Sequence, residues 1–105
     1  MRIYSDAFEH ILNDPVPIIS DKSVTKLWFY MYGFQHGRGI ERKEDSLFDG
    51  FQNWIAERSN LGKEYSWANI LLFRAFGSEY EAFVLTKQMW FEYKAEVEQQ
   101  YNNPI

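Results

Sequence analysis

Residues 78–100 read SEYEAFVLTKQMWFEYKAEVEQQ, and this stretch predicts one long amphipathic helix. Ser78, followed three residues later by Glu81, fits a capping box, in which both side chains bind free amide groups at a helix start. Apolar residues recur on one face of this helix when successive residues are placed about 100° apart. The predicted core face consists of Ala82, Phe83, Thr86, Met89, Trp90, Tyr93 and Val97. A long helix with such a face must pack against other elements, and the absence of strand-like alternation elsewhere favours an all-α fold.

Four further segments upstream show helical spacing of apolar residues, at 5–13, 23–35, 47–58 and 67–76. Residues 14–17, Asp-Pro-Val-Pro, should end the first helix and begin a linker that extends to about residue 20, because proline disfavours helix in the residue before it. Glycines and mixed charges predict an exposed loop over 37–44. The chain is therefore expected to form a single-domain bundle of four to five helices over residues 1–105.

Local residue types suggest where these helices begin and which lies innermost. Ser5 or Asp6 is a candidate cap for the first helix, and Asp45 or Ser46 for the third. Ser66 is a candidate cap for the fourth helix, which Gly77 should end. Residues 23–35 are apolar on nearly all sides, so this helix is expected to be central.

The composition is that of a compact chain with many contact residues. Its 105 residues suffice for one hydrophobic core and include nine Phe, seven Tyr and four Trp. There is no cysteine, which excludes disulfides, thiolate catalysis and zinc sites that need cysteine ligands. No apolar run is long enough to cross a membrane, and residues 1–9 lack the apolar stretch of a secretory signal. A cytoplasmic location without membrane contact is the expectation.

The net charge of −4 is concentrated at the two ends of the chain. Residues 1–21 hold four acids and one base, and residues 78–105 hold five acids and two bases. Binding to a phosphate backbone needs a basic surface, so no direct nucleic-acid binding is expected. Acidic ends would instead suit a basic protein partner.

The residues that could carry chemistry form no specific motif. Asp6, His10 and Asp14 recur every four residues and could face a metal ion, but no other segment offers an obvious matching ligand. Serine, histidine and aspartate are present without a nucleophile elbow. We therefore expect no metal, no cofactor and no enzymatic activity.

Arg74 and the four tryptophans raise separate questions. Arg74 interrupts the apolar run LLFRAF, so it either forms a structural ion pair, extends its stem to the surface or serves an interface. Trp28, Trp54, Trp67 and Trp90 lie one on each of four expected helices, on or near the apolar face, and are assigned to the core.

Aromatic and small residues in the second half of the chain form a longer pattern. It reads Phe48-x2-Phe51-x2-Trp54-Ile55-x2-Arg58, then Ser66-Trp67-x2-Ile70, then Ser78-Glu79-x2-Ala82-Phe83. This pattern resembles small helical immunity proteins of bacterial polymorphic toxin systems, including those of contact-dependent growth inhibition. The similarity covers roughly residues 27–93.

The resemblance implies a protein that binds a cognate toxin domain, often a nuclease with a basic groove, and covers its active site or substrate groove. The edge of the last helix would then be the binding surface, because it is more apolar than a solvated flank requires. Charge would come from Glu81, Glu92, Glu96 and Glu98, and apolar anchors from Tyr80, Val84 and Phe91.

Two other functions remain open at this point. In the first, the chain is a homo-oligomer, with a homodimer as the simplest form, and the same edge of the last helix pairs with its own copy. In the second, the chain is a small-ligand or metal enzyme, which predicts a pocket with convergent polar groups. The edge could also simply be covered by the first helix.

Overall fold

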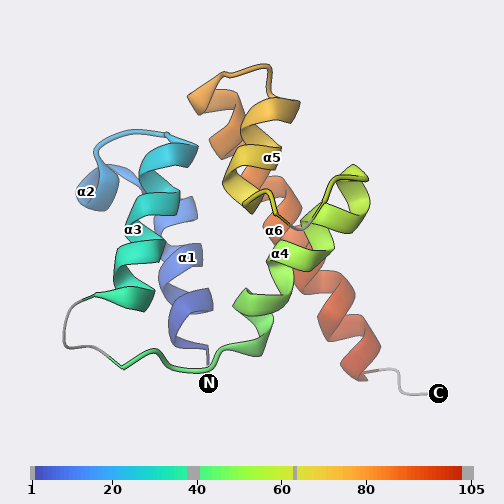
Figure 1. Cartoon of the computed structure of the whole chain (residues 1–105). Coiled ribbons are helices and arrows are strands. Elements are labelled where there is room, and N and C mark those ends of the chain that lie inside the picture. The colour runs from blue at the N-terminus through green and yellow to red at the C-terminus, as the bar shows by residue number, and fades with distance from the viewer. Residues whose placement is uncertain (1, 38–40, 63, 103–105) are drawn as a thin grey trace.

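The computed structural model of the chain describes residues 2–37, 41–62 and 64–102 and shows an all-α bundle over them (Figure 1). The six helices of this described part are α1 (Ile3–Asn13), α2 (Val16–Ile19), α3 (Val24–His36), α4 (Ser46–Ser59), α5 (Trp67–Arg74) and α6 (Glu79–Asn102). The all-α prediction is confirmed. The helix count exceeds the predicted four to five because α2 forms where a linker was expected. The expected loop over 37–44 lies partly outside the described residues, at 38–40, and its described part is not helical.

Helix α1 ends at Asn13, as the prolines predicted, but a short helix, α2, follows where a linker to about residue 20 was expected. Pro15 is the residue before the helix, and its carbonyl accepts hydrogen bonds from the backbone N–H groups of Ile18 (3.1 Å) and Ile19 (2.9 Å). Proline is tolerated in a first helical turn because the N–H groups there need no partner within the helix. The short helix places Ile19 in the core with 6% of its surface exposed.

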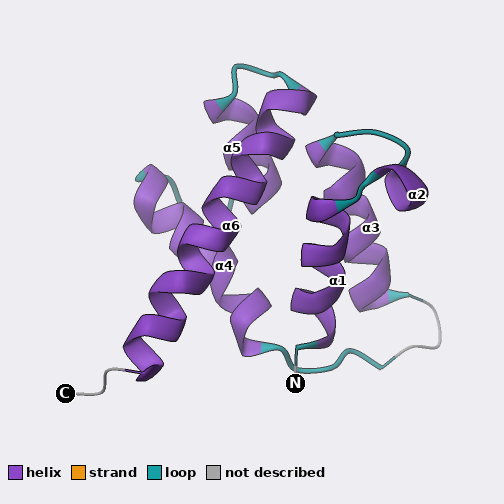
Figure 2. Ribbon diagram, turned by 180° about the vertical axis from the view of Figure 1, so that it is seen from behind, coloured by secondary structure: helices purple, strands orange, loops and turns teal. Residues whose placement is uncertain are grey.

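Helix α6 runs along the molecule and contacts α1, α3, α4 and α5 (Figure 2). Its buried residues are those predicted from the sequence, namely Ala82, Phe83, Thr86, Met89, Trp90 and Tyr93, and Val97 packs partly buried against the core. The predicted core face of the last helix is therefore confirmed.

Aromatic rings meet edge to face at the centre of the bundle. The ring of Phe8 lies 5.0 Å from Trp90, 5.3 Å from Trp67 and 5.2 Å from Phe48, measured between ring centroids. Such T-shaped pairs place the positive edge of one ring against the negative face of another. Trp67 and Trp90 are buried as predicted, whereas Trp28 and Trp54 are only half-buried at the margin of the core.

Helix α3 is not the central helix that its apolar sequence predicts. It buries Val24, Leu27 and Met31 on one face and leaves Phe29 and Tyr32 exposed, at 63% and 52%. The exposed side is partly covered by its own rings, because Tyr32 stacks on Trp28 with centroids 5.1 Å apart. The prediction failed because apolar composition on all sides of a helix does not show how many sides have a neighbour.

The buried carboxylate of Asp45 caps the N-terminal ends of two helices. Its Oδ1 accepts a hydrogen bond from the Phe48 N–H (3.0 Å) and so caps α4, as predicted. Its Oδ2 accepts from the N–H groups of Tyr4 (3.0 Å) and Ser5 (2.8 Å) in the first turn of α1, and the Ser5 hydroxyl donates to Oδ1 (2.9 Å). The expectation that Ser5 or Asp6 caps the first helix is therefore wrong, because α1 begins at Ile3 and the cap comes from a distant segment.

Glu79, in the first turn of α6, binds the start of α3 in a similar way. Its Oε1 accepts hydrogen bonds from the Ser23 hydroxyl and the Thr25 N–H, both 2.9 Å, and its Oε2 accepts from the Thr25 hydroxyl at 2.6 Å. Burial raises the pKa of this carboxyl, but the hydrogen bonds from Thr25, Ser23 and the Val24 N–H outweigh it, and the pKa lies below its ordinary value of 4.5. The helix pair is thus joined through a carboxylate that is stable in its charged form.

Tyr93 crosses closely over α4 and fixes the distance between α4 and α6. Its hydroxyl donates to the Leu47 carbonyl at 2.6 Å, and a Cβ on Gly50 would lie 2.5 Å from that hydroxyl oxygen. Burial, followed by the charges of Asp45 and Asp49, raises the pKa of Tyr93 to about 12. The phenol therefore stays protonated and remains a hydrogen-bond donor at neutral pH.

Candidate protein-binding surface

The turn between α5 and α6 holds a phenylalanine away from the rest of the protein. Phe76 follows the end of α5 with a φ of 55°, and 99% of its surface is exposed. The Gly77 N–H donates to the Leu72 carbonyl (2.9 Å) and the Phe76 N–H donates to the Phe73 carbonyl (3.0 Å), which together form a Schellman motif. The left-handed position in this motif is usually glycine, so the sequence places a large apolar ring where the backbone disfavours any side chain.

Apolar residues of α5 and of the segment before it surround a hollow beside Phe76. The hollow has a volume of about 1000 Å³ and is lined by Leu61, Tyr65, Asn69, Ile70, Leu72, Phe73, Arg74, Phe76 and Gly77. Phe73 is 76% exposed, Tyr65 49% and Leu61 37%. Monomeric soluble proteins rarely leave several neighbouring large apolar side chains in water, so this area is a candidate binding surface.

A second, smaller hollow adjoins Phe76 on the α6 side. Its volume is about 330 Å³, and it is lined by Arg74, Ala75, Phe76, Glu81, Val84, Leu85 and Gln88. Tyr80, in the first turn of α6, is also exposed, and the Lys22 ammonium group lies 5.3 Å from the centre of its ring. We call the whole area the tip surface and define it as Leu61, Tyr65, Phe73, Arg74, Phe76, Tyr80, Glu81 and Val84.

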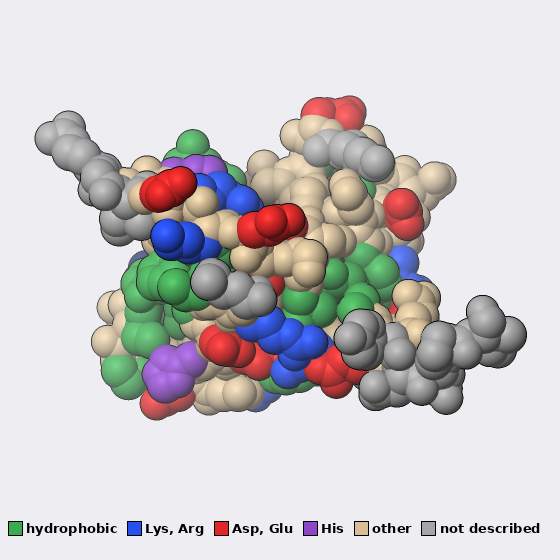
Figure 3. All heavy atoms as spheres, turned by 90° about the horizontal axis from the view of Figure 1, so that it is seen from below, with side chains coloured by type: hydrophobic (Ala, Val, Ile, Leu, Met, Phe, Trp, Pro, Cys, Tyr) green, Lys and Arg blue, Asp and Glu red, His purple; other side chains and the backbone are tan. Residues whose placement is uncertain are grey.

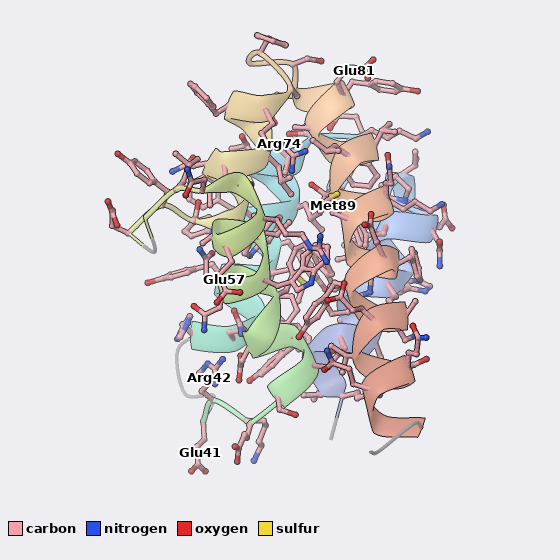
Figure 4. The ribbon with its side chains drawn as sticks, turned by 90° about the vertical axis from the view of Figure 1, so that its right-hand side faces the viewer. Glu41, Arg42, Glu57, Arg74, Glu81 and Met89 are labelled. Atoms are coloured by element: carbon pink, nitrogen blue, oxygen red, sulfur yellow. The ribbon has the colours of Figure 1, made fainter. Side chains whose placement is uncertain are left out.

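Two opposite charges lie within the tip surface. Arg74 is the last residue of α5 and Glu81 lies in the first turn of α6, at the same end of the molecule, whereas Glu57 lies further along on α4 (Figure 4). Both side chains of the tip are exposed, and neither forms an ion pair with another residue that the structure describes. Among the described residues, Arg74 therefore forms no structural ion pair, and its side chain is exposed.

The residues predicted for partner binding separate into two groups. Tyr80, Glu81 and Val84 lie together in the first turns of α6 and are exposed. Further along the helix, Phe91 is half-buried and packs against the core, while Glu92 is exposed. Helix α1 does not cover Tyr80 or Val84, so the first group is accessible.

Glu96 and Glu98, the other predicted charges, point to different neighbours. Glu96 Oε2 accepts a hydrogen bond from Arg58 of α4 at 2.5 Å, and Glu98 Oε1 accepts one from Arg2 at 3.2 Å. Acidic and basic side chains lie intermixed on the face seen in Figure 3. Part of the acidic excess of residues 78–105 is thus balanced by Arg58 of α4 and by Arg2, which the fold brings next to α6.

The sequence does not predict Phe73 and Phe76 as surface residues, because both belong to the apolar residues of the expected helix at 67–76. One available signal was Asn69, which precedes Phe73 by one helical turn and is also exposed. Residues four apart share a helix face, so a polar residue at that spacing indicates that the phenylalanine faces water. No comparable signal marks Phe76, because its exposure depends on the conformation of the turn.

The remaining candidate chemistry can be compared with the fold. No group of three or more His, Asp and Glu side chains is placed to hold a metal ion within residues 2–37, 41–62 and 64–102. None of the helices in these ranges has the length and apolar character needed to cross a membrane. Comparison of the chain with family models, curated proteins and solved structures found no match.

Proposed function

We propose that this chain is an immunity protein that binds a cognate toxin domain through the tip surface and neutralises it by covering its active site or substrate groove. The observation that carries the binding role is the fully exposed Phe76 beside an apolar hollow. The identity of the partner as a toxin domain rests on the resemblance of the aromatic pattern in residues 27–93.

The tip surface has the composition of a protein-binding hot spot. Such sites have aromatic or arginine anchors at the centre, surrounded by residues that exclude water. Phe73, Phe76 and Arg74 would be the central anchors, with Tyr65 and Tyr80 around them. Exposing Phe76 in a left-handed conformation carries a cost in the free protein, and contact with a partner would offset part of that cost by burying the ring.

Exposed carboxylates on α6 extend this surface and would attract a basic toxin domain. Glu81 and Glu92 are exposed, and neither forms an ion pair with a described residue, unlike Glu96 and Glu98. Carboxylates near an interface speed association with a basic groove by electrostatic steering. The proposed contact therefore combines apolar anchors at the tip with acidic residues along the exposed face of α6.

Co-expression with the C-terminal domain encoded by the adjacent upstream gene tests the proposal. We expect a tight one-to-one complex that suppresses the toxicity of that domain. Phe76→Ala should weaken the complex by about tenfold or more, since an anchor in the centre of an interface carries much of the binding energy. Absence of a complex in the wild-type chain would contradict the immunity role.

The matched control is Phe29→Ala on α3, which removes a ring that is 63% exposed but lies on another helix. This variant should bind as the wild type does. Equal weakening by Phe29→Ala and Phe76→Ala would contradict the placement of the site at the tip, and unchanged binding by both would do the same.

A further inference from the structure

We infer that two copies of this chain pair through the tip surface about a twofold axis, with Phe76 of each copy inserted into the apolar hollow of the other. A symmetric pair needs a surface that is complementary to itself, because each residue that contacts its counterpart is contacted in return. The tip surface meets this condition in both shape and charge.

The shape condition is met because a protrusion and a hollow lie side by side. Phe76 is 99% exposed, and the hollow of about 1000 Å³ beside it is lined by apolar side chains that include Leu61, Tyr65 and Phe73. A twofold axis between the ring and the hollow would place each ring opposite the other copy's hollow. Two rings and both hollow walls would then leave water together, which favours association in proportion to the apolar area buried.

The charge condition is met by Arg74 and Glu81. They come from the two helices that flank Phe76 in the chain, and neither forms an ion pair among the described residues. A twofold axis that passes between these two side chains would place Arg74 of one copy opposite Glu81 of the other, and the pair would form twice. A second copy supplies the opposite charge for both side chains within one contact.

Charge reversal gives a test that uses only this chain. Sedimentation equilibrium should show a concentration-dependent dimer for the wild type. Arg74→Glu and Glu81→Arg should each raise the dimer dissociation constant about tenfold or more, because each places like charges opposite each other twice. An equimolar mixture of the two variants should form a heterodimer, and the double variant Arg74→Glu/Glu81→Arg should pair with itself again.

Controls separate a specific contact from a general effect of charge or folding. Glu57→Arg makes the same charge change as Glu81→Arg, but at an exposed residue of α4 that lies away from Arg74 and Glu81 (Figure 4). This variant should leave the dimer unchanged. Phe76→Asn should remain folded by circular dichroism and sediment as a monomer. Phe29→Asn should still sediment as a dimer.

A wild type that remains monomeric at about 0.5 mM would overturn the inference. A dimer with a dissociation constant of about 1 mM would already be partly formed at that concentration. A dimer that persists in both single reversals, or a mixture that fails to pair, would also overturn the inference. The dimer and a toxin complex at the same surface would exclude each other. Because sedimentation of the chain alone involves no toxin, failure of this inference and failure of the proposed function are distinguishable.

Discussion

Phe51 and Phe76 are the same residue type in opposite situations, at 0% and 99% exposure. Phe51 meets Trp90 edge to face, with ring centroids 5.2 Å apart, and its helix gives it neighbours on several sides. Phe76 lies on a turn and pairs with no other described aromatic ring. The comparison shows that the many aromatic residues serve two purposes: one set holds the bundle together, and the other is available for binding.

The largest effect on this comparison should come from Trp90→Ala in the core. The ring is completely buried and contacts Phe8, Phe51 and Tyr93, so its removal should lower the free energy of unfolding by about 3–5 kcal/mol. Urea denaturation followed by circular dichroism measures the loss. Phe73→Ala at the tip should change stability by less than about 0.5 kcal/mol. Similar losses in both variants would remove the distinction between the two regions.

Asp45→Ala should have the next largest effect, because one carboxylate serves two helices. It leaves the N–H groups of Tyr4, Ser5 and Phe48 without their acceptor in a buried site, for an expected loss of about 2–4 kcal/mol. Ser66→Ala removes the cap of α5 alone, and should cost about 1 kcal/mol. Thermal unfolding of the two variants compares the caps. A loss in Asp45→Ala no greater than in Ser66→Ala would contradict the double role.

Acid should weaken the bundle through Glu79. The pKa of Glu79 is lower in the folded chain than its ordinary value of 4.5, so its contribution to stability is complete above pH 4.5 and is lost as the pH falls below that value. Glu79→Gln should therefore be less stable than the wild type at neutral pH and lose less stability on acidification. Urea midpoints between pH 7 and about pH 3 test this.

The control for that measurement is Glu92→Gln, which alters an exposed carboxylate on the same helix. Its acid dependence should match that of the wild type. If the urea midpoints of Glu79→Gln show the same dependence on pH as those of the wild type, the charged carboxylate does not stabilise the contact between α3 and α6.

Phe76→Asn should change stability least of these variants, and it tests directly whether the exposed ring serves the fold or serves binding. Asparagine tolerates the left-handed conformation better than phenylalanine, and the exposed ring has almost no packing to lose. We expect stability to stay level or rise by up to about 1 kcal/mol, while binding through the tip is lost. A melting temperature clearly below that of the wild type would show that the ring supports the fold.

Local features of the sequence predicted much of the fold. The core face of α6 follows from helical periodicity, and the caps at Asp45, Ser66 and Ser78 follow from the hydrogen bonds that these side chains make within three residues. These are short-range properties, so a single sequence suffices to find them. The second half of the predicted capping box is wrong, because the Ser78 N–H donates to the Ala75 carbonyl (3.1 Å) instead of to the Glu81 side chain.

The site was harder to predict because its properties depend on distant neighbours. Tyr80 and Val84 were identified correctly as lying outside the core, but Phe73 looks like a core residue until the position of α5 is known. The pairing of Glu96 with Arg58 joins two helices that are far apart in sequence. No local pattern could show which carboxylates remain available to a partner.

The double cap at Asp45 also has a consequence for the order of events during protein synthesis. Asp45 leaves the ribosome after the residues of α1 whose N–H groups it binds, and α1 has no side-chain cap of its own. A short helix without a cap is marginal in water. The nascent first helix should therefore stay largely unfolded until translation passes the start of α4, and co-translational folding would begin with a contact that spans about forty residues.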